Sequence, residues 1–175
     1  VGRSALITNT TGSSNTAVGY NALDANTTSD YNTAVGAEAL GANTTGTRNC
    51  AFGYQALDAN TTASDNDAFG AYALGAVVTG TRNSAFGRSA LQENTGDDNV
   101  ALGHEALKLN TTGNKNTGIG PYALDANTTG SQNVALGYLA LSSNTTGNSN
   151  VAIGDQALFT QTTGGSNNVA VGRYS

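Results

Sequence analysis

Asparagine and threonine are the residues of this chain whose spacing could carry chemistry. Asn-Thr-Thr triplets recur along the sequence, and each has the form of an N-glycosylation acceptor. The triplets begin at Asn9, Asn26, Asn43, Asn60, Asn110, Asn127 and Asn144. The same residue types build turns, because asparagine tolerates the left-handed conformation and threonine hydroxyls bond to nearby backbone. We therefore favour turns over glycan acceptors.

A second asparagine recurs about six residues after each triplet begins. It occupies Asn15, Asn32, Asn49, Asn66, Asn83, Asn99, Asn116, Asn133 and Asn150, and we call it the asparagine column. A column of amides could bind a ligand, but stacked asparagines more often join neighbouring strands through side-chain ladders. The column predicts a structural asparagine ladder.

Other candidate ligands and catalysts do not recur at fixed positions. Asp30, Asp65, Asp97 and Asp98 could hold calcium, yet they share no single position, and the calcium-binding nonapeptide is absent. His104 is the single histidine and falls in a variable turn position. We find no nucleophile set, metal cluster or dinucleotide fingerprint. The sequence predicts no catalytic residue, metal or cofactor, although parallel β-helix enzymes with paired carboxylates remain an alternative.

The composition of the chain excludes several classes of binding partner. Charged residues are 11% of the chain and the net charge is −5, so there is no basic stripe for nucleic acid or anionic lipid. No apolar run is long enough to span a membrane, and no signal peptide is present. Because Cys50 is the single cysteine, no intrachain disulfide can form. We interpret it as a small side chain that this position of the repeat tolerates. Because the chain lacks methionine, we expect a segment of a longer polypeptide.

The sequence repeats itself about every seventeen residues, and this period predicts the secondary structure that positions these residues. A glycine recurs once per period, which predicts a positive φ angle or a close approach between chains. This glycine column comprises Gly19, Gly36, Gly53, Gly70, Gly87, Gly103, Gly120, Gly137 and Gly154. Short apolar segments between Gly- and Asn-rich turns favour strands over helices. The sequence predicts an all-β fold over residues 1–175, a parallel β-solenoid of about ten turns.

Each period contains two apolar segments, Ala followed by a large residue and Ala-Leu. If both are strands, alanine faces one side and its large neighbour the other, because side chains alternate along a strand. A narrow coil suits alanine inside, so the large column would pack against other copies in a parallel homotrimer. The reverse assignment, with the large residues inside and alanine at the contact, stays open and also leaves an apolar outer surface. The column near the axis would be Leu23, Leu40 and Leu57, or Val18, Val35 and Phe52.

Changes in repeat length locate the exposed loop. One repeat is a residue shorter at Asn94-Thr95-Gly96, and the last full repeat is a residue longer around Thr163-Gly164-Gly165. Exposed turns absorb such changes, so Thr27-Thr28 and Thr128-Thr129 should face solvent. Adjacent threonines do not form the flat spaced array of an ice-binding surface, which makes that function a minor alternative.

Tyrosines mark a further candidate surface. Tyr20, Tyr54 and Tyr138 share the turn position that follows the glycine column. Tyrosine is favoured in binding hot spots and can stack on sugar rings. It can equally shield a subunit seam, and both readings stay open.

The phrases Asn-Thr-Ala-Val-Gly-Tyr-Asn-Ala-Leu (15–23) and Asn-Val-Ala-Ile-Gly-Asp-Gln-Ala-Leu (150–158) carry a resemblance. They resemble the head repeats of trimeric autotransporter adhesins and, more closely, the repeats of tail-fibre-like proteins of phages and bacterial surfaces. Val77-Val78 departs from the pattern, standing where Asn-Thr is expected.

The resemblance implies a homotrimeric, extracellular fibre or attachment module on a virion tail or a bacterial surface. Its partner would be a cell-surface glycan or receptor. The alternatives are a filament scaffold with no receptor of its own, and a glycan- or ice-binding solenoid.

Overall fold

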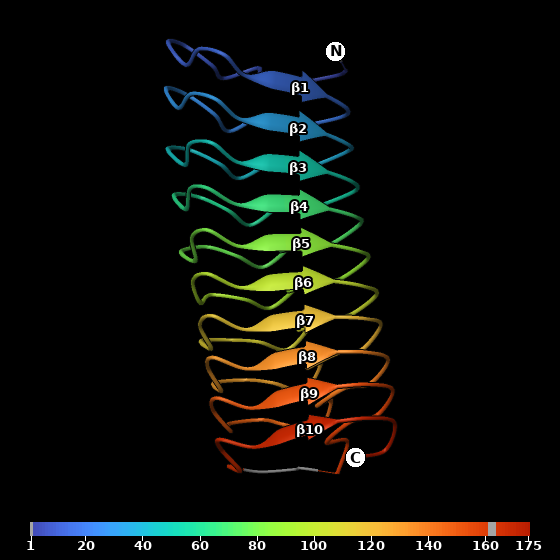
Figure 1. The fold of residues 1–175 in the computed structure, drawn as a ribbon. Helices are drawn as coiled ribbons and strands as arrows, with labels where there is room; N and C mark the ends of the chain where they lie inside the picture. Colours follow the sequence, from blue (N-terminus) through green and yellow to red (C-terminus); the bar gives the residue numbers. More distant parts are fainter. Residues whose placement is uncertain (1, 161–163) are drawn as a thin grey trace.

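The chain winds into a coil in which every turn contributes one short strand. The computed structural model describes residues 2–160 and 164–175. Ten parallel strands form one sheet in sequence order, which confirms the predicted all-β solenoid (Figure 1). The strands are β1 (Thr16–Val18), β2 (Thr33–Val35), β3 (Cys50–Phe52), β4 (Asp67–Phe69), β5 (Ser84–Phe86), β6 (Val100–Leu102), β7 (Thr117–Ile119), β8 (Val134–Leu136), β9 (Val151–Ile153) and β10 (Val169–Val171).

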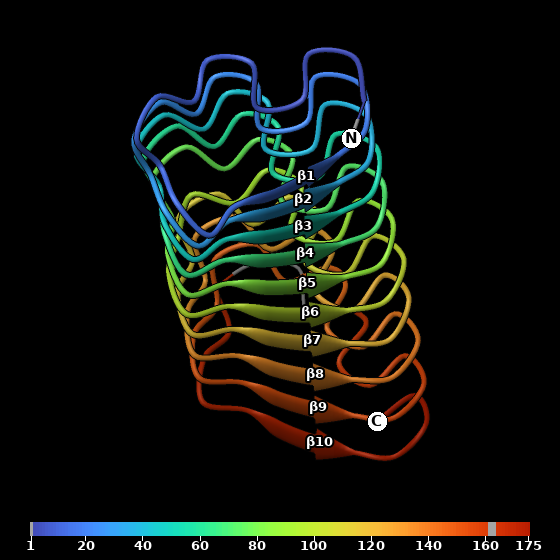
Figure 2. The same cartoon turned by 90° about the horizontal axis from the view of Figure 1, so that it is seen from above.

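Equivalent residues of successive turns stack directly on one another. Ala17 pairs with Ala34, and Ala34 pairs with Ala51. The strands lie along one side of the coil, and the turns close the rest of it (Figure 2). No segment of the described residues forms a helix of the length and hydropathy that a membrane span needs.

The glycine column ends each strand. Gly36 has a φ angle of 137°, and a Cβ added there would lie 2.3 Å from the carbonyl oxygen of Gly53 in the next turn. The remaining glycines of the column have φ angles between 125° and 142° and equally close neighbours. Both properties exclude other residues, and the close approach is between turns of one chain rather than between chains.

The Ala-Leu segment is not a strand, which corrects our expectation of two strands per turn. Leu23 has a φ angle of 54°, and its equivalents are left-handed too. Alternation of faces does not apply in such a turn, so Ala22 and Leu23 both point inward and are fully buried. A left-handed leucine costs about 1–2 kcal/mol, and burying its side chain returns about 1.5–3 kcal/mol. The core therefore stabilises the strained turn.

The interior contains the strand alanines, the Ala-Leu pairs and both sets of recurring asparagines. Ala34, at the centre of β2, is fully buried, while Thr33 and Val35 on either side are partly exposed. The predicted alternation is therefore correct within the strands. The alternative that placed Leu23, Leu40 and Leu57 at a trimer axis is wrong, because these side chains fill the coil itself.

The threonine loop is only partly as expected. Thr28 and Thr129 are exposed, but Thr27 and Thr128 are half-buried because each lies closer to the coil. The Thr128 hydroxyl donates to the carbonyl oxygen of Thr145 at 2.9 Å. In the short repeat the turn survives, since Asn94 Nδ2 donates to the carbonyl oxygen of Gly96 at 2.8 Å. Of the insertion expected around Thr163-Gly164-Gly165, Thr163 lies outside the described residues, and the Gly165 carbonyl oxygen accepts from Asn150 Nδ2 at 2.8 Å.

Candidate functional site

The outer side of the sheet is the largest apolar surface that the strands present. The third residue of every strand points outward, and we call this set the third column. It consists of Val18, Val35, Phe52, Phe69, Phe86, Leu102, Ile119, Leu136, Ile153 and Val171. Leu102 is 51% exposed and Leu136 is 43% exposed. Water therefore meets a continuous line of large apolar side chains along the rod, which soluble monomers rarely present.

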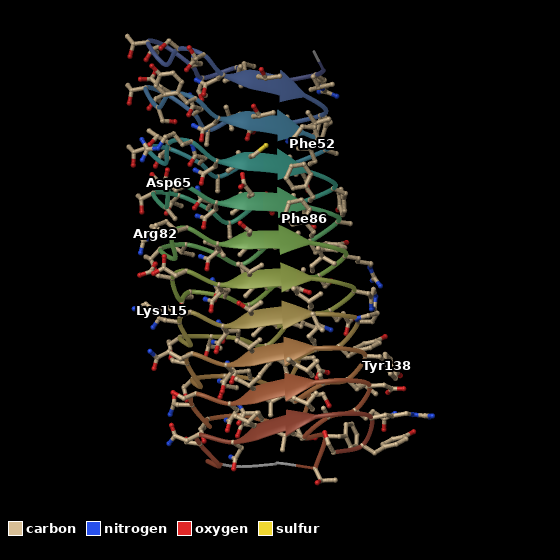
Figure 3. The ribbon with its side chains drawn as sticks, in the orientation of Figure 1. Phe52, Asp65, Arg82, Phe86, Lys115 and Tyr138 are labelled. Carbon is tan, nitrogen blue, oxygen red and sulfur yellow. The ribbon has the colours of Figure 1, made fainter. Side chains whose placement is uncertain are left out.

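Three phenylalanines in the middle of the third column stack face to face. The rings of Phe52 and Phe69 are 5.0 Å apart and inclined by 6°, and those of Phe69 and Phe86 are 4.7 Å apart and inclined by 3°. Figure 3 shows Phe52 and Phe86 at the ends of their strands, on the same side of the rod. We call Phe52, Phe69 and Phe86 the phenylalanine stack.

The first residue of every strand also points outward, and this first column changes character along the rod. It runs Thr16, Thr33, Cys50, Asp67, Ser84, Val100, Thr117, Val134, Val151 and Val169. Polar types dominate β1 to β5, and valine dominates β6 to β10. Asp67 is the one charged residue on the outward face, which we define as the first and third columns together.

Cys50 is half-buried within this first column. Burial, and secondarily the negative charge of Asp67, raise the pKa of its thiol. The protonated thiol is the less reactive form, so its environment favours a packing role over a nucleophilic one.

One group of charges lies in the loops before the strands, where Figure 3 shows Asp65, Arg82 and Lys115 at the end of the sheet away from Phe52 and Phe86. Arg48 Nε and Nη2 bind the two carboxylate oxygens of Asp65 at 2.6 and 2.9 Å. This bidentate contact holds the pKa of Asp65 below its usual range. Arg82 binds Asp98 in the same way, at 2.6 and 3.1 Å.

All four loop aspartates considered above as calcium ligands have protein partners. Asp65 and Asp98 bind arginines, as described above. Asp30 Oδ1 accepts the backbone N–H of Ser13 at 2.7 Å, and Asp97 Oδ1 accepts that of Thr81 at 2.7 Å. Within residues 2–160 and 164–175 no group of three His, Cys, Asp or Glu side chains could hold a metal ion.

The asparagine column forms a hydrogen-bonded ladder inside the coil. The backbone N–H of Asn49 donates to Asn32 Oδ1 at 3.0 Å, and Asn32 Nδ2 donates to the carbonyl oxygen of Gly46 at 2.8 Å. The same two contacts recur from Asn15 to Asn150. Each amide thus joins a turn to the next, and nearly all these side chains are buried away from any ligand.

The triplet asparagines form a second ladder, which sequence reasoning missed. Asn127 Nδ2 donates to Asn110 Oδ1 at 2.6 Å and to the carbonyl oxygen of Gly130 at 2.9 Å. Asn144 Nδ2 donates in turn to Asn127 Oδ1 at 2.9 Å. From Asn26 onward these side chains are fully buried, so a glycan on Nδ2 would remove a donor and have no space in the folded coil.

This second ladder is interrupted at Val77, which is buried where the next asparagine would lie. Asn60 Oδ1 is therefore buried without a hydrogen-bond partner. The interruption follows from the departure seen in the sequence at Val77-Val78. The signal that could have revealed the ladder is the exact recurrence of asparagine on both sides of that gap.

Several tyrosines lie beside the outward face, where the chain leaves the strands. We call Tyr20, Tyr54, Tyr72, Tyr122 and Tyr138 together the tyrosine corner. Tyr54 and Tyr138 are each 46% exposed, and Figure 3 shows Tyr138 projecting from the rod. Tyr20 is exposed too, without a ring partner among the described aromatic contacts. The rings of Tyr54 and Tyr72 meet edge to face at 5.3 Å, and those of Tyr122 and Tyr138 at 6.2 Å.

Acidic and amide groups surround Tyr54. Gln55 Nε2 donates to Glu38 Oε2 at 2.6 Å. Burial raises the pKa of Asp58, and the negative charges of Glu38 and Asp24 raise it further. His104, in the same corner, contacts the Tyr122 ring edge on at 5.3 Å. The corner can therefore offer aromatic faces and hydrogen-bonding groups together.

Comparisons with known proteins do not assign the chain to a family. No protein-family model, curated protein or solved structure matches it. The geometry of the outward face and of the tyrosine corner therefore carries the functional argument.

Proposed function

We propose that this chain is a structural rod module that assembles side by side with copies of itself in an extracellular fibre or attachment structure. The observation that carries the proposal is the third column, which stays apolar and partly exposed through ten successive strands. Burying such a line in an interface removes apolar surface from water at about 25 cal/mol per Å².

The partner best suited to this face is another copy of the same chain. Adjacent strands in a sheet lie about 4.8 Å apart, so the face repeats at that interval. A partner must offer an apolar line with the same repeat over the whole length, as a parallel copy does. Like charges would oppose self-association, but the first and third columns contain one charged residue, Asp67, and the Arg48–Asp65 and Arg82–Asp98 pairs lie in the loops before the strands.

Three copies around one axis suit the shape of the coil. Each coil has a single sheet, so each offers one outward face, and cyclic closure covers all of these faces together. The homotrimer and its extracellular location also follow from the resemblance to tail-fibre-like and adhesin-head repeats. The corresponding alternative is a filament scaffold with no receptor contact of its own.

Light scattering tests the assembly directly. We expect a mass of about three times 17.5 kDa for the unmodified segment. Replacing Leu102→Asp and Leu136→Asp together should give folded monomers, because both side chains point out of the coil. The matched control is Thr28→Asp with Thr129→Asp, which adds the same charges on the loop side and should leave the mass unchanged. A stable monomer for the unmodified segment contradicts the proposal.

The tyrosine corner supports a second candidate role, attachment to a carbohydrate. Tyr54 offers an exposed ring beside Gln55, Glu38 and Asp58, and sugars are commonly held by stacking combined with amide and carboxylate hydrogen bonds. Repeated weak contacts on an oligomer would add through avidity. A glycan array probed with the assembled rod tests this role. Tyr54→Ala with Tyr138→Ala should abolish binding at unchanged mass, and binding that survives contradicts the role.

A further inference from the structure

A repeating face leaves the position of one copy along another undefined. Most third-column residues are Val, Leu or Ile, so sliding a copy by one turn, about 4.8 Å, replaces one aliphatic contact with another. A rod that assembles through such a face needs a feature that makes one alignment better than its neighbours.

We propose that the phenylalanine stack sets this axial register, so that copies pair with β3, β4 and β5 at the same level. The inference rests on the side-by-side assembly proposed above. Phe52, Phe69 and Phe86 occupy three consecutive strands, and their rings are nearly parallel, with inclinations of 6° and 3°. The stack is therefore a single aromatic block between aliphatic stretches.

The block penalises every displaced alignment. A shift of one turn keeps two aromatic levels matched and places the outer rings opposite Val35 and Leu102. A shift of three turns leaves no phenylalanine opposite another. Each lost aromatic contact weakens an alignment by about two- to tenfold.

The first column supports the same alignment independently. Its residues are mainly polar in β1 to β5 and mainly valine in β6 to β10. An antiparallel copy would place Val134 and Val151 opposite the polar half, whereas a parallel copy in register places valine levels together and leaves Asp67 at a polar level where water can reach its charge. The two columns together favour one direction and one level.

Self-sorting tests the register. The displaced variant carries Val18→Phe, Val35→Phe, Phe69→Val and Phe86→Val, which moves the aromatic block by two strands without changing composition. All four positions are on the outward face, so the coil should fold unchanged. When the variant and the unmodified chain are aligned in register, they share an aromatic level only at Phe52. Sliding the variant by two turns restores all three aromatic levels, but it leaves two turns at the end of each chain without a partner.

Co-refolded, differently tagged chains are then counted by native mass spectrometry. We expect mixed assemblies of unmodified and displaced chains to fall at least about fivefold below the statistical fraction, since two aromatic levels are lost. Two control chains that both carry Phe52→Leu, Phe69→Leu and Phe86→Leu should mix statistically. Statistical mixing of the unmodified and displaced chains overturns the register role while leaving the assembly intact. Monomers throughout overturn the assembly itself.

Discussion

Replacing Asn127 with valine should destabilise the coil, because Asn127 is a central member of the triplet ladder. Its side chain is fully buried, donates to Asn110 and Gly130, and accepts from Asn144. Valine is sterically acceptable at this position of the repeat, since Val77 already occupies the equivalent place. The change therefore tests hydrogen bonding with little change in shape.

The expected size follows from the contacts. Three hydrogen bonds are lost at about 1 kcal/mol each. Asn110 Oδ1 would keep only a 3.4 Å contact with Asn116 Nδ2. Burying the valine side chain returns about 1.5 kcal/mol. The net loss in the free energy of unfolding is about 1.5 kcal/mol, which lowers Tm by roughly 3–6 °C in a chain of this length.

Thermal unfolding followed by circular dichroism measures the effect, with two controls. Asn60→Val removes only the donations to Asn43 Oδ1 and the Ala63 carbonyl oxygen, and it also removes the unpartnered Asn60 Oδ1. It should therefore cost at least about 1 kcal/mol less than Asn127→Val. Thr129→Val, on the exposed loop, should change stability by less than about 0.5 kcal/mol. Equal losses for Asn60→Val and Asn127→Val would refute the ladder reasoning.

Three further changes test other parts of the structure. Val77→Asn should raise Tm by a few degrees, because the new amide can donate to the unpartnered Asn60 Oδ1; a lower Tm would contradict the reading of the gap. Gly118→Ala should stabilise by about 0.5 kcal/mol in urea unfolding, since alanine fills this position in the other strands; a loss of stability would show that the Leu107 side chain and the Ala123 carbonyl oxygen, both 3.2 Å from the added Cβ, do not yield. The Arg48 contact depresses the folded-state pKa of Asp65, so its stabilisation is present above the unfolded pKa of about 3.9 and is lost as pH falls through the folded value. The Tm of Asp65→Asn should therefore fall less steeply than that of the unmodified chain below about pH 4, and parallel curves would exclude the ion pair as a source of stability.

The sequence predicted the coil because its strongest signal is the period. The glycine column and the alanine at the centre of every strand but β7 follow from local rules on φ angle and alternation. The Ala-Leu segment was misread because alternation was applied to residues such as Leu23, which is left-handed rather than extended. Leucine seldom adopts that conformation, and here its burial in the interior of the coil offsets the cost.

The triplet ladder could not be predicted from residue type. Polar residues beside threonine and glycine suggest an exposed turn, and nothing local distinguishes that turn from a buried one. Burial of Asn110 and Asn127 depends on the amides of neighbouring turns supplying each other's hydrogen bonds. This is a property of the stacked coil, so it becomes visible only when successive repeats are placed in register.

The two outward columns of the sheet form an internal comparison that bears on function. Both are partly exposed, and neither is needed to fill the coil, whose core is alanine, leucine and asparagine. The first column accepts Thr, Cys, Asp, Ser and Val, as expected where solvent tolerates most side chains. The third column changes among Val, Phe, Leu and Ile but never becomes polar. Exposure alone does not explain this restriction to apolar residues. The first column lies two residues earlier in each strand and is also partly exposed, yet it contains polar residues. The side-by-side contact that we propose would explain the restriction, because a parallel copy of the chain would follow the third column along the whole rod.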